Sequence, residues 1–294
     1  MLPLSLALLL VAGGAQAHGA GNAASSWSLD AWTVLPLLAM AILLGRGTVR
    51  LARRAGRGAG PLRRQSGALA LGWACLVLAL VSPLASVGHV SFSAHMLQHE
   101  LLMLVAAPLI VLGRPTAVLA WGVPAAGRQG LAWLLRPLRA LGRAATQPLV
   151  ATMLQAAVLW LWHAPPIFDR ALRLPAWHAA QHLSFLLAAV AFWVAILDRC
   201  GRSLGGRSLA ALCLFASSLV SGALGALMAL SESPWYAGYA ALGLTPSGLS
   251  PAEDQQLAGL LMWVPGGLLH AGAALALLGR ALSQPAEVPH ARLG

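Results

Sequence analysis

The sequence has little charge and no lysine. Only 9% of the 294 residues are charged, compared with about 25% in ordinary soluble domains, and all 19 basic residues are arginines. Hydrophobic residues make up 59% of the chain, and the mean hydropathy is +0.75. This composition excludes an ordinary soluble domain and predicts a membrane protein.

Cysteine is also scarce. The three cysteines, Cys75, Cys200 and Cys213, form no C-x-x-C motif, so neither a disulfide framework nor a thiolate metal site is indicated. We expect them to pack as small buried hydrophobic residues.

Seven apolar stretches have about the length that a helix needs to cross a bilayer. They cover residues 28–45, 67–87, 92–112, 147–163, 176–197, 208–230 and 257–279. The predicted fold is an all-α bundle of seven transmembrane helices, forming one domain over residues 18–283. The connections leave no room for a separate soluble domain.

The arginines cluster in alternate connections. Segments 46–66 and 113–146 carry twelve of them, and five more follow the fifth and seventh spans. Only Arg170 and Arg173 fall on the other side. Cytoplasmic loops are rich in arginine, so we expect an N-out, C-in multi-pass protein of the bacterial inner membrane. The net charge of +11 then reflects topology and not a nucleic-acid partner.

Three further segments carry predictions. Residues 1–17 contain a short apolar run that ends in Ala15-Gln16-Ala17, which is typical of a signal peptide with its cleavage site. Residues 284–294 would form a cytoplasmic tail. Segment 117–143 has tryptophans and spaced arginines, which favours an amphipathic helix on the inner membrane surface or a short re-entrant piece.

Histidines gather near the predicted outer surface. His95 and His99, and likewise His178 and His182, are four residues apart, so each pair projects from one helix face and could hold a metal ion. His163 ends the fourth span and His89 precedes the third, at similar depth. Imidazole suits copper, zinc and iron. The alternative is that these histidines sit at the headgroup level and cap helices or form hydrogen bonds across the bundle, without any ligand.

Three other residues lie deeper in the predicted spans. Met103 continues the His95 and His99 stripe, so with Met153 it could form a softer cuprous site, although ordinary packing would explain both. Glu100 needs a partner, a proton or water inside a membrane; a salt bridge to Arg170 or a bond to a histidine would serve. We expect His270 to make a hydrogen bond between helices.

The connection 231–256 leads into the last span with a polar motif. Asp254 and Gln255 stand at a helix start, where an acid can cap the helix or act as an outer partner of a metal ligand. Trp263 is expected to pack against the histidines, and Pro265 with the two following glycines is expected to kink the helix.

Four stretches resemble one family, the multi-spanning CtaG-type cytochrome c oxidase assembly factors. They are HMLQHELLMLVAAPLIVLGRP at 95–115, LWHAPPIFDRAL at 161–172, WHAAQHLSFLLAAVAFW at 177–193 and DQQLAGLLMWVPGG at 254–267. The resemblance covers residues 30–280. It implies a seven-span bundle that matures a haem-copper oxidase and handles copper. The recurring family positions fall on His95, His99, His163, His182, Asp254, Gln255 and Trp263, whereas Glu100 stands where the family usually has an apolar residue.

Three functions are compatible with these residues. The first is an assembly factor without enzymatic activity, which binds copper and passes it to oxidase subunits. His95, His99, His178 and His182 would be ligands, His163 a further ligand or gate, and Asp254 an outer partner of one imidazole.

The second is an intramembrane zinc hydrolase with Glu100 or Asp254 as its base. The third is a haem carrier, which the paired spacing of the histidines does not favour.

Overall fold

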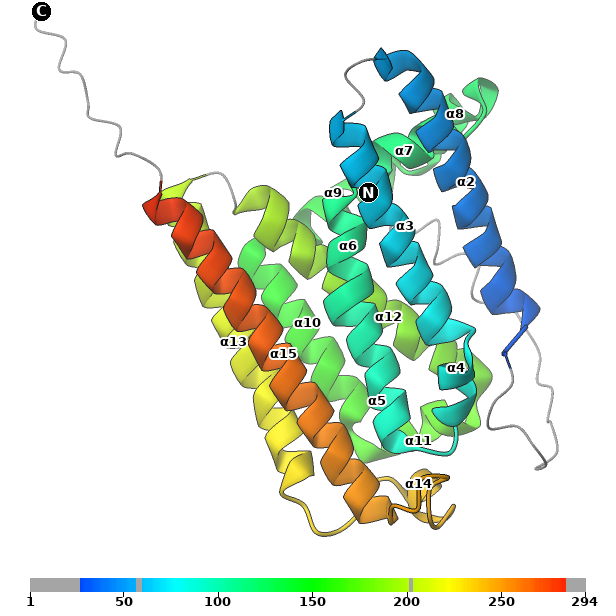
Figure 1. The fold of residues 1–294 in the computed structure, drawn as a ribbon, viewed down its shortest axis with the longest axis vertical. Coiled ribbons are helices and arrows are strands. Elements are labelled where there is room, and N and C mark those ends of the chain that lie inside the picture. Colours follow the sequence, from blue (N-terminus) through cyan, green and yellow to red (C-terminus); the bar gives the residue numbers. More distant parts are fainter. Residues whose placement is uncertain (1–26, 57–59, 201–202, 284–294) are drawn as a thin grey trace, which may run out of the picture.

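The structure is a computed structural model, and it describes residues 27–56, 60–200 and 203–283. These residues form helices and short connections, with no strand among them, which confirms the all-α prediction. The predicted signal peptide and tail lie outside the described residues. Figure 1 shows the helices running mainly along one direction, as in a membrane bundle.

The helical segments follow one another with few intervening residues. They are α2 (Ala31–Ala55), α3 (Gly60–Leu80), α4 (Pro83–Val87), α5 (Phe92–Glu100), η3 (Leu101–Ala106), α6 (Ala107–Leu112), α7 (Pro115–Gly122), α8 (Ala125–Leu134), α9 (Arg136–Ala145), α10 (Pro148–His163), α11 (Pro165–Arg173), α12 (Pro175–Val194), η4 (Ala195–Arg199), α13 (Leu204–Ala229), α14 (Ala237–Ala240) and α15 (Pro251–Leu282). Both η segments are π-helical.

Six of the described helices are long and apolar enough to cross a membrane. The predicted fourth span differs from them, because α10 alone is only 16 residues long and α9 meets it at an angle of 86°. The two together bring the number of candidate spans to seven. The prediction of multiple transmembrane helices is therefore confirmed, with six to seven spans.

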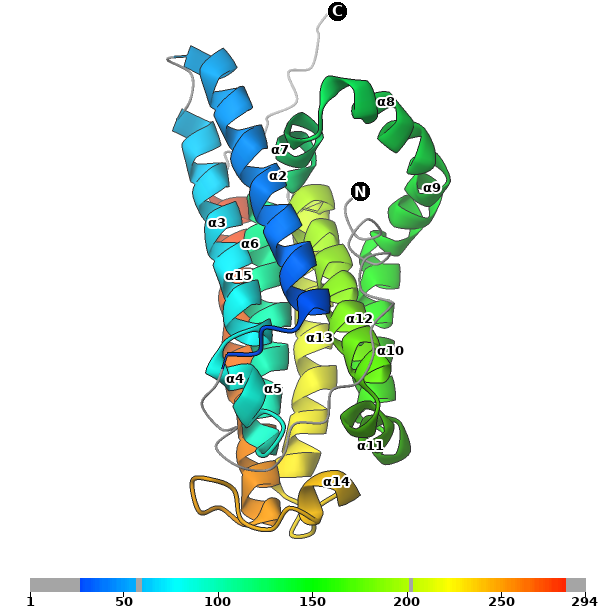
Figure 2. The same ribbon diagram turned by 90° about the vertical axis from the view of Figure 1, so that its right-hand side faces the viewer.

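Segment 117–143 is not a single surface helix. Its first part belongs to α7, which packs so closely on α2 that a Cβ atom on Gly47 would overlap the carbonyl of Val118. Arg50 donates a hydrogen bond to the carbonyl oxygen of Trp121 at 2.9 Å. The rest forms α8 and α9, which arch away from the bundle (Figure 2). Contact with α7 explains why α2 continues ten residues beyond its predicted end.

Helices α13 and α15 lie side by side along one edge of the bundle (Figure 1). Glycines permit this contact, since a Cβ atom on Gly225 would lie 2.7 Å from the carbonyl oxygen of Gly259. Helix α15 continues without a break through Pro265, so the expected kink does not interrupt it. Its N-terminus is closed by a capping box between Ser250 and Glu253, which explains the early start of this helix.

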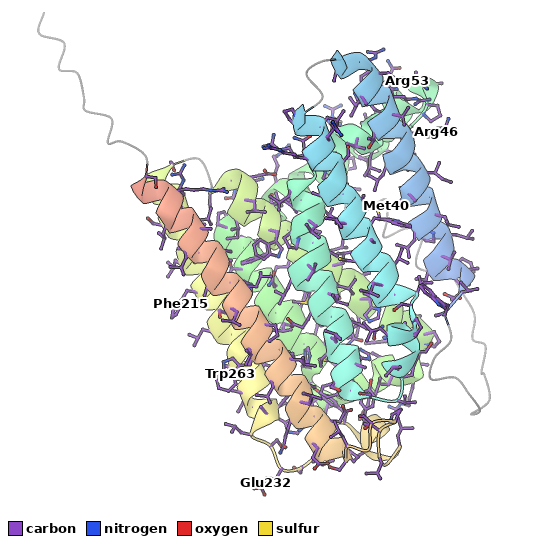
Figure 3. All side chains as sticks on the ribbon, in the orientation of Figure 1. Met40, Arg46, Arg53, Phe215, Glu232 and Trp263 are labelled. Carbon is purple, nitrogen blue, oxygen red and sulfur yellow. The ribbon has the colours of Figure 1, made fainter. Side chains whose placement is uncertain are left out.

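The two ends of the bundle differ in charge. The end with the α2–α3 connection, α7 to α9 and the last turn of α15 is called the arginine end; Arg46 and Arg53 mark it in Figure 3. The end with α4, α11 and α14 is called the histidine end, and Glu232 lies there. The connections that are rich in arginine alternate along the sequence with those that are not, and in the structure they gather at one end of the bundle.

Candidate metal centre

Three imidazoles from two helices meet near the histidine end. One ring nitrogen each from His95 and His99 on α5 and from His182 on α12 lie within 4.8 Å of one another. His95 and His99 are 1% and 3% exposed. Both helices start at the histidine end, so their i, i+4 pairs lie at the same depth. The predicted convergence of histidines from separate helices is present.

The remaining predicted histidines surround this group, which we call the histidine cluster (His95, His99 and His182). The ring of His178 is centred 4.3 Å from that of His182, and the ring of His163 lies 6.3 Å from that of His99. His89 is exposed, with its ring 5.7 Å from that of His178. The cluster therefore has two close neighbours and one peripheral one.

Several ring nitrogens in this layer are buried without a hydrogen-bond partner. They are Nε2 of His95, both nitrogens of His99, Nε2 of His178 and Nε2 of His182. Buried polar atoms in proteins are almost always satisfied, and exceptions commonly indicate an ion or water. Helix capping does not account for these nitrogens, because a histidine that caps a helix would form a hydrogen bond through its ring, and these nitrogens form none.

The spacing of the three nitrogens is close to that of a metal site. Imidazole nitrogens bind zinc at about 2.0 Å, so three ligands of one such ion lie about 3.5 Å apart. The longest separation in the cluster is 4.8 Å at most, so a closure of about 1.3 Å would bring all three onto one ion. Rotation of the rings about their side-chain bonds can supply such a shift.

Tyr239 fixes the proton position on His95. Its hydroxyl donates to the carbonyl oxygen of Gly88, and its oxygen lies 3.0 Å from Nδ1 of His95. Burial and the nearby Asp254 raise the pKa of Tyr239 well above its usual value, so the hydroxyl keeps its proton. Since that single proton goes to Gly88, Nδ1 of His95 must be the donor, and Nε2 keeps a free lone pair for a metal.

His163 is oriented in a similar way. Its Nδ1 lies 2.7 Å from the carbonyl oxygen of Leu159, which can only accept, so Nδ1 carries the proton and Nε2 has the lone pair. That Nε2 lies 3.3 Å from the sulfur of Met96. Tyr236 donates to the backbone carbonyl of His163 at 3.0 Å. The ring is thus held beside the cluster with its acceptor nitrogen free.

Asp254 acts on the helix that carries two ligands. It accepts hydrogen bonds from the backbone N–H groups of Phe92 and Ser93 and from the hydroxyls of Ser91 and Ser93. These bonds cap the start of α5 from the start of α15, so the carboxylate supports His95 through the helix and not through the imidazole. Gln255 accepts from the N–H of Trp235 and donates to the carbonyl of Ser233, which ties the α13–α15 connection down.

Three expectations, for Trp263, Met153 and His270, fail. Trp263 is 45% exposed and lies at the outer edge of the α13–α15 pair (Figure 3), because its face of α15 covers Gly225. Met153 is 71% exposed and faces away from Met103. His270 makes no hydrogen bond to another helix; it stacks on Trp193 at 6.1 Å.

Glu100 forms no salt bridge to Arg170, whose guanidinium instead lies 4.6 Å from the ring centre of Trp177. The carboxylate oxygen Oε2 of Glu100 is buried with no hydrogen-bond partner. Glu100 and Met103 line a separate cavity that also contains His270.

Comparison with known families gives a match over most of the chain. The family model of the cytochrome c oxidase caa3 assembly factor, Caa3_CtaG, matches residues 42–284. The chain belongs to this family. It is therefore a cytochrome c oxidase assembly factor. The three histidines of the histidine cluster all lie within the matched region. No curated protein and no solved structure shows a significant match.

Two functional residues escape sequence reasoning, namely Tyr236 and Tyr239. They lie in the connection between α13 and α15, and both are buried against the histidine layer. The sequence offers one signal for them: they are the only two tyrosines in the chain, and they stand three residues apart. Their targets depend on the path of the loop, which composition does not specify.

Proposed function

We propose that this assembly factor binds a copper ion between His95, His99 and His182 and passes it to a cytochrome c oxidase subunit during assembly. The observation that supports this most is the group of buried, unpartnered imidazole nitrogens. Imidazole is a good ligand for copper. Three ligands leave one side of the ion open. A copper ion that is to be passed on needs such an open side, because an incoming ligand must be able to reach it.

The surroundings of the cluster suit transfer. His178 and His163 each offer a lone-pair nitrogen next to the first three, so a copper ion could exchange ligands without entering the lipid. By the positive-inside rule, the arginine end faces the cytoplasm. The histidine cluster then lies on the extracytoplasmic side of the bacterial plasma membrane, within reach of the outer surface of the oxidase.

Metal analysis of the purified chain tests this function. Protein loaded with copper and washed with a weak chelator should retain copper, and the His95→Ala, His182→Ala double variant should lose the copper held by imidazoles. Glu232→Gln, an exposed acid at the same end, is the control and should retain the wild-type amount. Wild-type copper content in the double variant would overturn the copper site.

The assembly role needs a test in cells. A strain without this protein should lose oxidase activity under copper limitation, and the wild-type chain should restore it. The double variant should fail to restore activity at equal protein levels, and added copper should partly compensate. Full oxidase activity in the deletion strain at low copper would contradict the proposal.

The zinc hydrolase alternative receives no support from the family match. Its candidate base Asp254 is engaged by four hydrogen bonds at the start of α5. The only metal-ligand group found among the described residues consists of imidazoles alone. Stoichiometric zinc together with hydrolytic activity in the purified protein would restore this alternative.

A further inference from the structure

A second polar site lies deeper in the bundle. A cavity of about 20 Å³ is enclosed by α5, η3, α10, α13 and α15, and its lining includes Glu100, Met103, Gln155, Ser217, Met262 and His270. That volume holds one water-sized occupant. The cavity is distinct from the histidine cluster, none of whose members line it.

The lining contains unsatisfied polar atoms from three helices. Oε2 of Glu100, Oε1 of Gln155 and both ring nitrogens of His270 are buried and have no hydrogen-bond partner. His270 is only 2% exposed. Gln155 donates through Nε2 to the hydroxyl of Ser217 at 3.2 Å, which leaves its oxygen available. Atoms of this kind at one small cavity call for an occupant that satisfies them together.

The helix that joins the two sites is distorted at the deeper one. In η3 the N–H of Ala107 bonds to the carbonyl of Leu102, five residues back, and such π-helical turns are frequent at functional sites. Trp193 donates to the carbonyl of Met103 at 3.0 Å and stacks on His270. One indole thus holds both the widened turn and the imidazole of the deeper site.

The chemistry of the lining favours a soft cation over water alone. Two thioethers, Met103 and Met262, accompany the imidazole of His270, and thioether and imidazole ligands together suit cuprous copper. Glu100 adds a carboxylate that can balance the charge of a monovalent ion. Gly266 borders this space, and a Cβ atom there would lie in ordinary contact with Oε2 of Glu100, at 3.7 Å.

We infer that this cavity is a second binding position for a cuprous ion, with Met103, Met262, His270 and Glu100 as its ligands. Met103 follows His99 by four residues, so the position lies about 6 Å further into the membrane along that helix. The inference rests on the proposed function in one respect, the identity of copper as the cargo. A copper ion would then have two successive places along the bundle.

Anaerobic titration of the purified full-length chain with cuprous ion tests this inference. The wild type should bind two equivalents, and copper–sulfur scattering in the X-ray absorption spectrum should grow with only one of them. The Met103→Leu, Met262→Leu variant should lose that equivalent and its sulfur signal while keeping the other. Leucine nearly preserves the volume of methionine, so the fold should be retained. Met153→Leu, at an exposed methionine, should bind two equivalents.

The His95→Ala, His182→Ala variant separates the two sites. It should lose the nitrogen-bound equivalent and retain the sulfur-bound one. If only the sulfur-bound copper appears in the wild type, the proposed function fails and the deeper site stands. Wild-type protein that binds copper without sulfur scattering overturns the deeper site, and the cavity then holds water. A sulfur signal that persists in the double methionine variant overturns it as well.

Discussion

Removal of one hydroxyl, in Tyr239→Phe, tests how the protein prepares His95 for copper. In the wild type, the tyrosine oxygen lies 3.0 Å from Nδ1 of His95 while its proton goes to Gly88. Phenylalanine fills nearly the same space but cannot accept the Nδ1 proton. The proton on His95 is then free to move to Nε2, the nitrogen that faces the cluster, and each copper-binding event must displace it.

The expected magnitude follows from what is removed. Loss of an outer partner of a metal-ligating histidine typically lowers metal affinity about 10- to 100-fold, which corresponds to about 1.4–2.7 kcal/mol. The carbonyl of Gly88 also loses the hydroxyl that donates to it, and Nδ1 of His95 loses the tyrosine oxygen as a partner. That change should lower the free energy of unfolding by about 1–3 kcal/mol.

Competition with a chromophoric copper chelator measures the affinity, and Tyr236→Phe provides the matched control. Tyr236 is equally buried in the same connection, but its hydroxyl donates to the backbone carbonyl of His163 and touches no ring nitrogen. The control should lose similar stability and keep its copper affinity within about threefold. Equal loss of affinity in both variants, or no loss in Tyr239→Phe, would refute the reasoning.

Three other predictions follow from the fold. Asp254→Ala removes four hydrogen bonds to the first turn of α5 and should lower the free energy of unfolding by about 1–2 kcal/mol and weaken copper binding in parallel; unchanged melting would contradict this role of Asp254. Gly225→Ala should destabilise the α13–α15 pair by about 1–3 kcal/mol, whereas Gly272→Ala, where a Cβ atom meets nothing within 4 Å, should be tolerated in thermal unfolding. Alkaline phosphatase inserted at Gly243 should be active and at Leu141 inactive, and the reverse pattern would invert the proposed orientation.

The transmembrane helices and the histidine cluster were predictable because both depend on local spacing. A run of apolar residues long enough to cross a bilayer identifies a helix, and the i, i+4 spacing of His95 and His99 places both rings on one face whatever surrounds it. Depth then follows from the distance of each residue from the start of its helix.

The rotation of each helix was not predictable in the same way. Helices that are apolar all round give no periodic signal for the face that points inward. Met153 was therefore expected inside and points outward, whereas Met262 takes the place beside Met103. The targets of Tyr239 and Asp254 also lie more than a hundred residues away in sequence, across a connection whose path no spacing rule specifies.

Copper K-edge X-ray absorption on the Met103→Leu, Met262→Leu protein with one bound equivalent tests the central claim most directly. The account predicts three imidazole nitrogens at about 2.0 Å from the metal, no sulfur, and loss of this signal in a protein that also carries His95→Ala and His182→Ala. A spectrum with fewer than three imidazoles, or one that the histidine substitutions leave unchanged, would contradict it.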